Sequence, residues 1–92
     1  MNSANVVHNE SKKRFEVRVE SHIAELTYTL QRKTIIFTHT GVPPALEGHG
    51  IGSKLVRAGL EYARAKKLKV KTTCWFVSGF LERHPEYQDM AE

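Results

Sequence analysis

The residues best placed to do chemistry begin with a glycine-rich segment in the middle of the chain. Gly48, Gly50 and Gly52 lie at alternate positions between a predicted strand and a predicted helix. Glycine allows the backbone to approach a ligand closely, and the free N–H groups at the start of a helix point toward that ligand. Because these amides and the helix dipole favour negative oxygens together, the segment is predicted to bind an anion such as a pyrophosphate.

The spacing of this segment excludes two known phosphate motifs. A P-loop needs Gly-Lys-Ser/Thr, whereas Gly52 is followed by Ser53 and Lys54 in the opposite order. A dinucleotide-binding fingerprint needs a third glycine where Ser53 stands and an acidic residue about 20 positions further on, where residues 69–71 read Lys-Val-Lys. The glycines alone are also compatible with a tight turn between strand and helix.

The elements before the glycines predict an antiparallel sheet. Residues 1–13 are polar and show no sustained periodicity, so we expect a mobile tail. Apolar and polar residues then alternate over 14–20 and 24–30, as in half-buried strands, and residues 34–40 are rich in β-branched and aromatic side chains. Three strands joined by short connections predict an antiparallel meander.

The elements after the glycines predict a crossover. An apolar stripe at helical spacing runs through residues 51–65, alternation over 68–76 predicts a fourth strand, and residues 77–83 can form a short helix that ends before Pro85. A strand-helix-strand unit is right-handed and makes its strands parallel. We therefore expect an α/β (α+β) fold in which residues 14–92 form one domain with a four-stranded mixed sheet.

Around the glycines the sequence resembles the GNAT superfamily of N-acyltransferases. The signature of that superfamily is Val-x-Pro followed shortly by Arg/Gln-x-x-Gly-x-Gly/Ala, and Val42-x-Pro44 and Gly50-x-Gly52 match it in spacing. The chain is most similar to very short GNAT-like proteins with a cysteine-bearing strand and a His-Pro-Glu-Tyr-like tail, so the resemblance covers residues 14–90. It implies a minimal GNAT fold and acyl-CoA-dependent N-acyltransferase activity, with acetyl-CoA as donor and an unidentified amine as acceptor.

The same resemblance implies which residues hold coenzyme A. Glu47 stands where the superfamily usually has Arg or Gln. A carboxylate beside a pyrophosphate is repulsive, so we expect the Glu47 side chain to point away and the backbone amides to form the cradle. The pantetheine arm is implied to lie near Gly41 and Val42. The residues implied to form the wall of the cradle are Glu47, Gly48, His49, Gly50, Ile51, Gly52 and Ser53.

His39 and Cys74 are the candidate catalytic residues, since the resemblance implies a donor thioester between the third and fourth strands. An alkylamine with a pKa near 10.4 must lose a proton before it attacks, and His39, at the end of the third strand, is the candidate base. Cys74 could accept the acyl group, with His39 across the gap as its activator, or protonate the departing thiolate. The alternatives are a buried structural cysteine and a histidine bonded to backbone.

Composition limits the remaining function classes. A net charge of +4 suits a polyanion, so one alternative is a small nucleic-acid-binding protein that uses the basic residues 64–71. Another alternative is a non-catalytic acyl-CoA binding or sensing module.

The single cysteine allows no internal disulfide and favours an intracellular location. No apolar run is long enough to predict a membrane span, and the five histidines and one cysteine lack the spacing of metal ligands, so we expect no metal.

Overall fold

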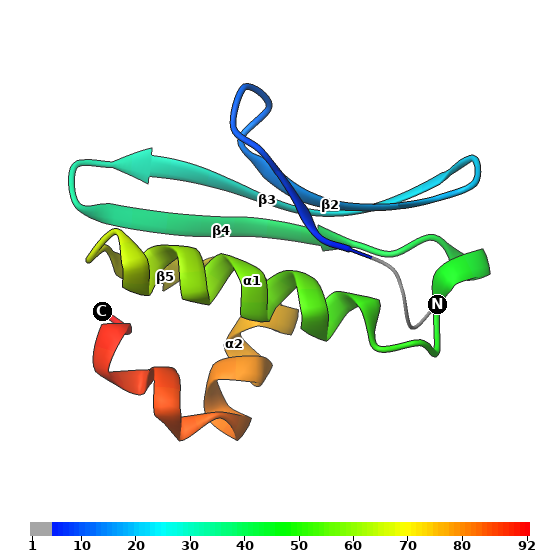
Figure 1. The fold of residues 1–92 in the computed structure, drawn as a ribbon. Helices are drawn as coiled ribbons and strands as arrows, with labels where there is room; N and C mark the ends of the chain where they lie inside the picture. Colours follow the sequence, from blue (N-terminus) through cyan, green and yellow to red (C-terminus); the bar gives the residue numbers. More distant parts are fainter. Residues whose placement is uncertain (1–4) are drawn as a thin grey trace.

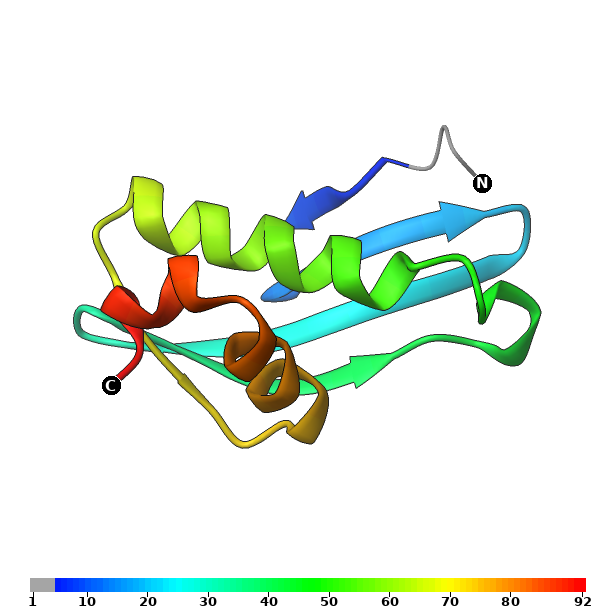
Figure 2. The same cartoon turned by 90° about the horizontal axis from the view of Figure 1, so that it is seen from below.

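The structure, a computed structural model, describes residues 5–92. One sheet carries helices on one of its faces (Figures 1 and 2). The elements in chain order are β1 (Val7–Asn9), β2 (Arg14–Val19), β3 (His22–Gln31), β4 (Thr34–Gly41), the 3-10 helix η1 (Pro44–Leu46), α1 (Ile51–Ala65), β5 (Lys69–Thr72), α2 (Trp75–Arg83) and the 3-10 helix η2 (Pro85–Met90).

The strands form a mixed sheet in the order β1-β2-β3-β4-β5. Strands β1 to β4 pair antiparallel, whereas β5 pairs parallel to β4 because α1 carries the chain back along the sheet between them. The predicted α+β fold with a mixed sheet, a meander and a parallel crossover is confirmed. The predicted number of four strands was wrong, since the sheet has five.

The additional strand, β1, lies within residues 1–13, which the sequence pattern suggested to be a mobile tail. The His8 ring stacks on Phe15 with the centroids 4.1 Å apart, and His8 Nε2 lies 2.7 Å from the Tyr28 hydroxyl. Three residues are too few for a visible alternation, so it is pairing with β2 that makes this segment a strand. Residues 1–4 of the predicted tail lie outside the described residues.

Helices α1 and α2 cover the same face of the sheet, and the apolar core fills the space between them and the strands (Figure 2). The approach of α1 to the sheet is close at Gly59, where a Cβ would lie 2.8 Å from Phe37 Cε1 and 3.1 Å from Leu26 Cδ2. A glycine is therefore required at this position, because real Cβ atoms do not approach other atoms so closely.

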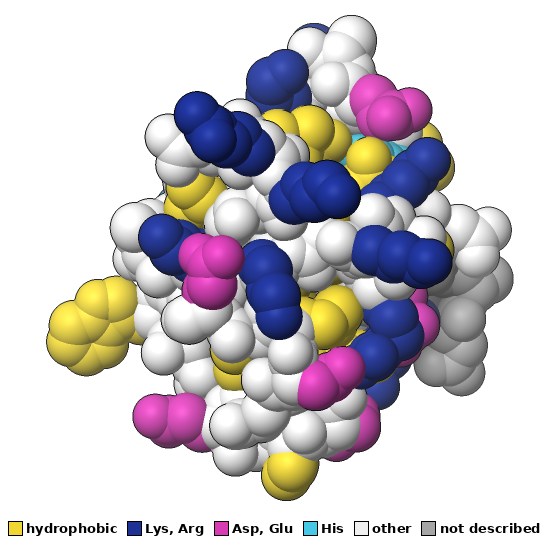
Figure 3. All heavy atoms as spheres, turned by 90° about the vertical axis from the view of Figure 1, so that its left-hand side faces the viewer, with side chains coloured by type: hydrophobic (Ala, Val, Ile, Leu, Met, Phe, Trp, Pro, Cys, Tyr) yellow, Lys and Arg dark blue, Asp and Glu magenta, His cyan; other side chains and the backbone are white. Residues whose placement is uncertain are grey.

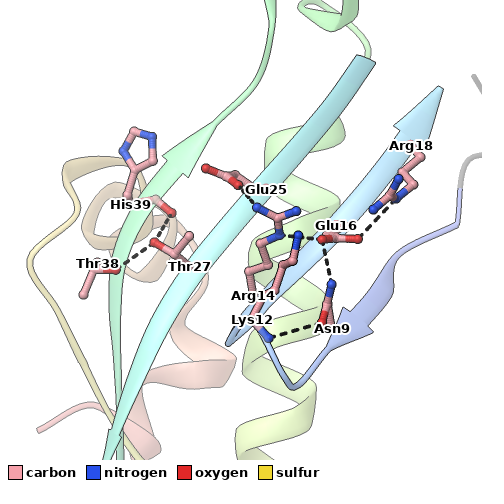
Figure 4. A network of polar contacts seen from close by, with 9 residues as sticks. All are labelled: Asn9, Lys12, Arg14, Glu16, Arg18, Glu25, Thr27, Thr38 and His39. Carbon is pink, nitrogen blue, oxygen red and sulfur yellow. Dashed lines mark hydrogen bonds and ion pairs between the residues drawn. The ribbon is translucent and has the colours of Figure 1, made fainter. Parts of the chain in front are cut away.

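The opposite face of the sheet carries polar side chains in place of a second helical layer (Figure 4). Glu16 is only 2% exposed and accepts hydrogen bonds from Arg14, Arg18 and Asn9. Burial raises the pKa of the Glu16 carboxyl, but these hydrogen bonds outweigh burial and hold that pKa below its ordinary value. This polar surface, which also contains Glu25, is called the open face below.

The boundary between β5 and α2 differs from the prediction. The strand stops at Thr72, although alternation predicted that it would run over residues 68–76. The Thr72 hydroxyl donates to the Phe37 carbonyl at 3.0 Å and accepts from the Cys74 N–H at 2.9 Å, which turns the chain out of the sheet. Helix α2 therefore begins at Trp75, two residues earlier than predicted, and Cys74 becomes its N-cap residue.

Candidate active site

A gap opens between β4 and β5 because β5 leaves the sheet before β4 ends. The two strands pair only from Thr34 to Phe37, and the Thr73 N–H then donates to the Phe37 carbonyl at 3.0 Å. Strand β4 continues to Gly41. Within residues 5–92, no strand pairs with this side of residues 38–41, so a ligand can run alongside their backbone. This space is called the strand gap below.

Cys74 lies at the strand gap, at the start of α2. Its Sγ lies 3.4 Å from the Thr40 Oγ1. Burial raises the pKa of the Cys74 thiol, but the Thr40 hydrogen bond and the N–H groups of Val77 and Phe76 outweigh burial and leave that pKa below its ordinary value. Neither N–H group makes a full capping hydrogen bond, so their effect is mainly electrostatic. A half-buried thiol with a lowered pKa is a candidate nucleophile.

The structure separates His39 from Cys74, contrary to the expected activation of Cys74 by His39. A β-bulge at Thr38 shifts the pairing of β4 with β3, so that His39 faces Thr27 and the open face (Figure 4). Without the bulge, strict alternation from Phe37 would have turned His39 toward α1 and the gap. It is Thr40 instead that contacts the thiol.

Two left-handed glycines shape the loop of residues 47–53, which is called the glycine loop below. Gly48 has φ 83° and Gly50 has φ 73°, a region that other residues rarely adopt. The first hydrogen bond of α1 runs from the Lys54 N–H to the Gly50 carbonyl at 3.1 Å. The N–H groups of residues 51–53 therefore precede the helical ladder, and no side chain of the described residues caps them. They are available to an anion.

A hollow of about 230 Å³ lies between the glycine loop and the start of α2. Phe76 closes one side of it, since a Cβ on Gly52 would lie 2.9 Å from Phe76 Cζ. Sequence reasoning missed Phe76, because its place depends on α2 beginning early, and no spacing in the sequence marks that start. The residues that line the hollow are Val42, Leu46, Glu47, Gly48, Gly50, Ile51, Gly52, Ser53 and Phe76.

Three of the residues implied to bind coenzyme A are placed differently from the rest. Glu47 lines the hollow, but its backbone N–H already donates to the Pro44 carbonyl at 3.2 Å and its side chain is exposed. His49 is exposed and does not line the hollow. Gly41 belongs to the open face, where a Cβ would lie 3.1 Å from His39 Nε2. The free backbone N–H groups of this segment are therefore those of residues 51–53.

A second hollow, of about 440 Å³, borders Cys74. It runs from the end of β5 along the outer side of α2 and is called the α2 groove below. The residues that line the α2 groove are Thr72, Thr73, Cys74, Trp75, Ser78, Gly79 and Glu82. Cys74 therefore lines the α2 groove, whereas Phe76, two residues further along α2, lines the hollow beside the free amides of α1.

The charged end of the molecule has a hollow of about 520 Å³ with a mostly charged lining, made by Arg57, Glu61, Arg64, Glu86, Tyr87 and Asp89. Lys and Arg side chains are spread over this end with Asp and Glu side chains between them (Figure 3). Arg64 pairs with Asp89 at 3.0 Å, and Lys71 pairs with Glu92 at 3.3 Å. Part of the basic segment 64–71 is thus neutralised locally, as expected of a solvated surface.

Within the part of the chain that the structure describes, no group of three or more His, Cys, Asp or Glu side chains could hold a metal ion. Among residues 5–92, no helix has the length and apolar character needed to cross a membrane.

Comparison with known proteins identifies a family that covers nearly all of the chain. Residues 14–90 match the model of the family described as GCN5-related N-acetyl-transferase. Protein NATD1 of Danio rerio is 33% identical over 87 residues, which are 89% of this chain and 79% of that protein. Human protein NATD1 is 32% identical over 83 residues, which are 87% of this chain and 74% of that protein.

A solved structure has the same arrangement of elements. The solution NMR structure of a GCN5-like protein from Staphylococcus aureus superimposes on this chain with a TM-score of 0.78 and 32% sequence identity. The superposition covers 100% of this chain and 91% of the other.

Proposed function

The chain belongs to the GCN5-related N-acetyltransferase family, and we propose that it binds acetyl-CoA and transfers the acetyl group to an amine. The observation that carries this proposal is the position of Cys74. Its thiol, with a lowered pKa, lies at the strand gap, and Phe76, two residues further on, lines the hollow beside the free amides of the glycine loop. A donor whose thioester enters the gap and whose phosphates reach the loop would contact both.

The donor is proposed to bind through backbone groups. Its pyrophosphate would accept hydrogen bonds from the N–H groups of residues 51–53, where the dipole of α1 adds its positive end. The pantetheine arm would pass Val42 and Phe76 and run along residues 38–41 of β4, whose open edge supplies amide partners. Glu47 faces solvent in this arrangement, and its carboxylate stays clear of the phosphates.

Cys74 is proposed to carry the acetyl group between donor and acceptor. Its thiolate attacks the thioester carbonyl of acetyl-CoA, the new carbon–sulfur bond forms, and coenzyme A leaves with the electron pair of the broken bond and takes a proton from water. A neutral amine then attacks the acetyl group on Cys74, the amide forms, and the Cys74 sulfur takes the proton that the nitrogen loses. The role of His39 as a base stays a prediction, and its place on the open face would restrict it to an amine on that side.

The proposed location and charge preference come from the composition of the chain. An intracellular location is proposed because the chain has one cysteine and so forms no internal disulfide. The net charge of +4 suits the phosphates of coenzyme A, and the charged end of the molecule is part of a solvated surface. No metal is included in the proposed reaction.

The experiment that tests the proposal is a calorimetric titration with acetyl-CoA, followed by intact-mass analysis of the same sample. We expect saturable binding and a mass increase of one acetyl group, which is absent in the Cys74→Ala variant and discharged when a primary amine is added. Binding without acetylation of Cys74, but with amide formation from an added amine, would replace the covalent route by direct transfer.

Two other results would overturn the proposed activity. Acetyl-CoA binding without transfer to any amine would identify a sensing module instead of an enzyme. Absence of acetyl-CoA binding, together with steeply salt-dependent binding to a polynucleotide, would favour the nucleic-acid alternative.

A further inference from the structure

The outer side of helix α2 forms one wall of the α2 groove. Trp75, Gly79 and Glu82 line the groove and occur at spacings of four and three residues, so they share one side of the helix. Val77 and Phe80, on the other side of α2, are fully buried in the core. The buried side of α2 therefore packs the helix against the core, and the outer side is available to contact a ligand.

Trp75 is the most exposed large apolar side chain of the described residues, with 93% of its surface accessible. It directly follows Cys74 in the chain and lines the same groove. An indole ring that is left in water offers a large apolar area and an electron-rich face, and that face attracts cations more strongly than other aromatic rings do. A ligand with a positive charge on an alkyl chain could contact both the apolar area and the electron-rich face of the ring.

Gly79 leaves the middle of the groove open. A glycine inside a helix costs about 1 kcal/mol relative to alanine, so its presence calls for a reason. Packing does not supply one, because a Cβ on Gly79 would meet only the flexible end of Arg83, with Nη1 at 3.3 Å. Gly59 of α1 is different, since the Phe37 ring would meet its Cβ. The space above Gly79 faces the groove and suits the chain of a ligand.

Glu82 places a carboxylate at the far end of the groove. Glu82 is seven positions after Trp75, which corresponds to about 10 Å along a helix axis. One end of the groove thus has the reactive thiol and an aromatic ring, and the other end has a negative charge. A simple monoamine cannot use both ends at once.

We propose that the α2 groove is the acceptor site and that it takes an amine with a second cationic group roughly 10 Å from the nitrogen that is acetylated. The inference rests on the proposed function, since it names the acceptor of the same reaction. The reacting nitrogen binds beside Trp75 as an ammonium, loses one proton to water, and then attacks the acetyl carbonyl on Cys74 as a neutral amine. The carbon–nitrogen bond forms, the bond to sulfur breaks, and the sulfur takes the proton that the nitrogen releases. The second ammonium stays paired with Glu82 and does not react.

The test uses the fluorescence of Trp75, the only tryptophan of the chain. Spermidine, a two-lysine peptide and n-butylamine are titrated separately into the full chain. We expect spermidine or the peptide to change the emission and to bind at least about tenfold more tightly than n-butylamine, because only the longer cations reach Glu82. The stronger of the two long ligands identifies the source of the amine.

Four variants sharpen the test through steady-state kinetics. Glu82→Gln is expected to raise KM for the long amine by roughly tenfold, with KM for acetyl-CoA unchanged, and to abolish the preference over n-butylamine. Trp75→Leu, which keeps an apolar side chain, is expected to raise KM for every amine, and Trp75→Phe to restore part of the affinity. Arg83→Gln is the matched control, since removal of a positive charge beside Gly79 should not weaken binding of a cation.

The results separate this inference from the proposed function. If amines are acetylated but Glu82→Gln and Trp75→Leu leave the KM for amines unchanged, the acceptor site lies elsewhere and the inference is wrong. The same holds if Arg83→Gln weakens binding, since the groove would then select an anion. If no acetyl transfer occurs, the proposed function fails, and the fluorescence titration alone decides whether the groove binds amines.

Discussion

Helices α1 and α2 both begin at the candidate active site, but they use their N-terminal amides in different ways. Helix α1 starts after the left-handed Gly50, and no side chain of the described residues caps its first N–H groups. The corresponding groups of α2, at Phe76 and Val77, act on the Cys74 sulfur of the same chain. The same helix-end electrostatics is therefore available to an external anion at α1, whereas at α2 it helps to lower the pKa of an internal thiol.

The glycines of the two helices also differ in what surrounds them. Gly52 and Gly59 of α1 face aromatic rings, Phe76 and Phe37, at distances that exclude a side chain. Gly79 of α2 faces the α2 groove. Helix α1 is thus fixed by close packing against the sheet and the start of α2, whereas the outer side of α2 is exposed to a ligand.

The largest expected effect tests this difference in packing. Gly59→Ala should lower the free energy of unfolding by about 2–3 kcal/mol, because the new methyl group meets the Phe37 ring and Leu26 in a filled core. Gly79→Ala should instead raise it by about 0.5–1 kcal/mol, since alanine favours the helix and meets only the flexible end of Arg83. Urea unfolding of both variants measures the difference. Shifts of the same sign and size would contradict the assignment of separate roles to the two glycines.

The success of the sequence analysis also divides between the two helices. The bounds of α1 could be predicted, because its apolar stripe repeats over four turns and glycines precede it. The start of α2 could not, since Thr72, Cys74 and Phe76 continue the alternation of β5. What ends the strand is the pair of hydrogen bonds made by the Thr72 hydroxyl, one of them to a residue that is distant in sequence.

Some features of the candidate site could also be predicted from the sequence, and others could not. The glycine loop was predicted residue by residue from its motif, and most of those residues line one hollow. The relation of His39 to Cys74 was not predictable, because a single extra residue in β4, at Thr38, reverses which side chains face the strand gap. A bulge is set by pairing with β3, and nothing in the local sequence marks it. Phe76 and the α2 groove were missed for a similar reason, as both depend on where α2 starts.

A second test exchanges charge at the two helix starts. Ser53→Glu and Ser78→Glu make the same change in the first turns of α1 and α2. Both should keep or slightly raise stability, because a carboxylate favours a helix N-terminus. Ser53→Glu should nevertheless weaken acetyl-CoA binding by at least about tenfold, or about 1.4 kcal/mol, since its charge opposes the pyrophosphate. Calorimetry with acetyl-CoA should find nearly unchanged affinity for Ser78→Glu, and equal losses in both variants would place the phosphates away from α1.

The smallest expected effect concerns two neighbouring residues of β4, Thr40 and His39. The thiol pKa of Cys74 is lowered, so the wild-type rate of alkylation by iodoacetamide should rise with pH below the ordinary range of a cysteine. Thr40→Val keeps the shape of the side chain and removes its hydrogen bond to sulfur, worth about 1 kcal/mol. The thiolate is then stabilised less, and the pH profile of alkylation should move to higher pH, with a rate several-fold lower at neutral pH.

His39→Gln is the control for that change, because the bulge at Thr38 turns His39 to the open face and away from the sulfur. Its alkylation profile should coincide with that of the wild type. The opposite pattern, a shift with His39→Gln and none with Thr40→Val, would mean that the imidazole reaches the thiol in solution. Activation of Cys74 would then come from a base across the strand gap. The amides of α2 would no longer account for the reactivity of the thiol, and the contrast between the starts of α1 and α2 would have no electrostatic basis.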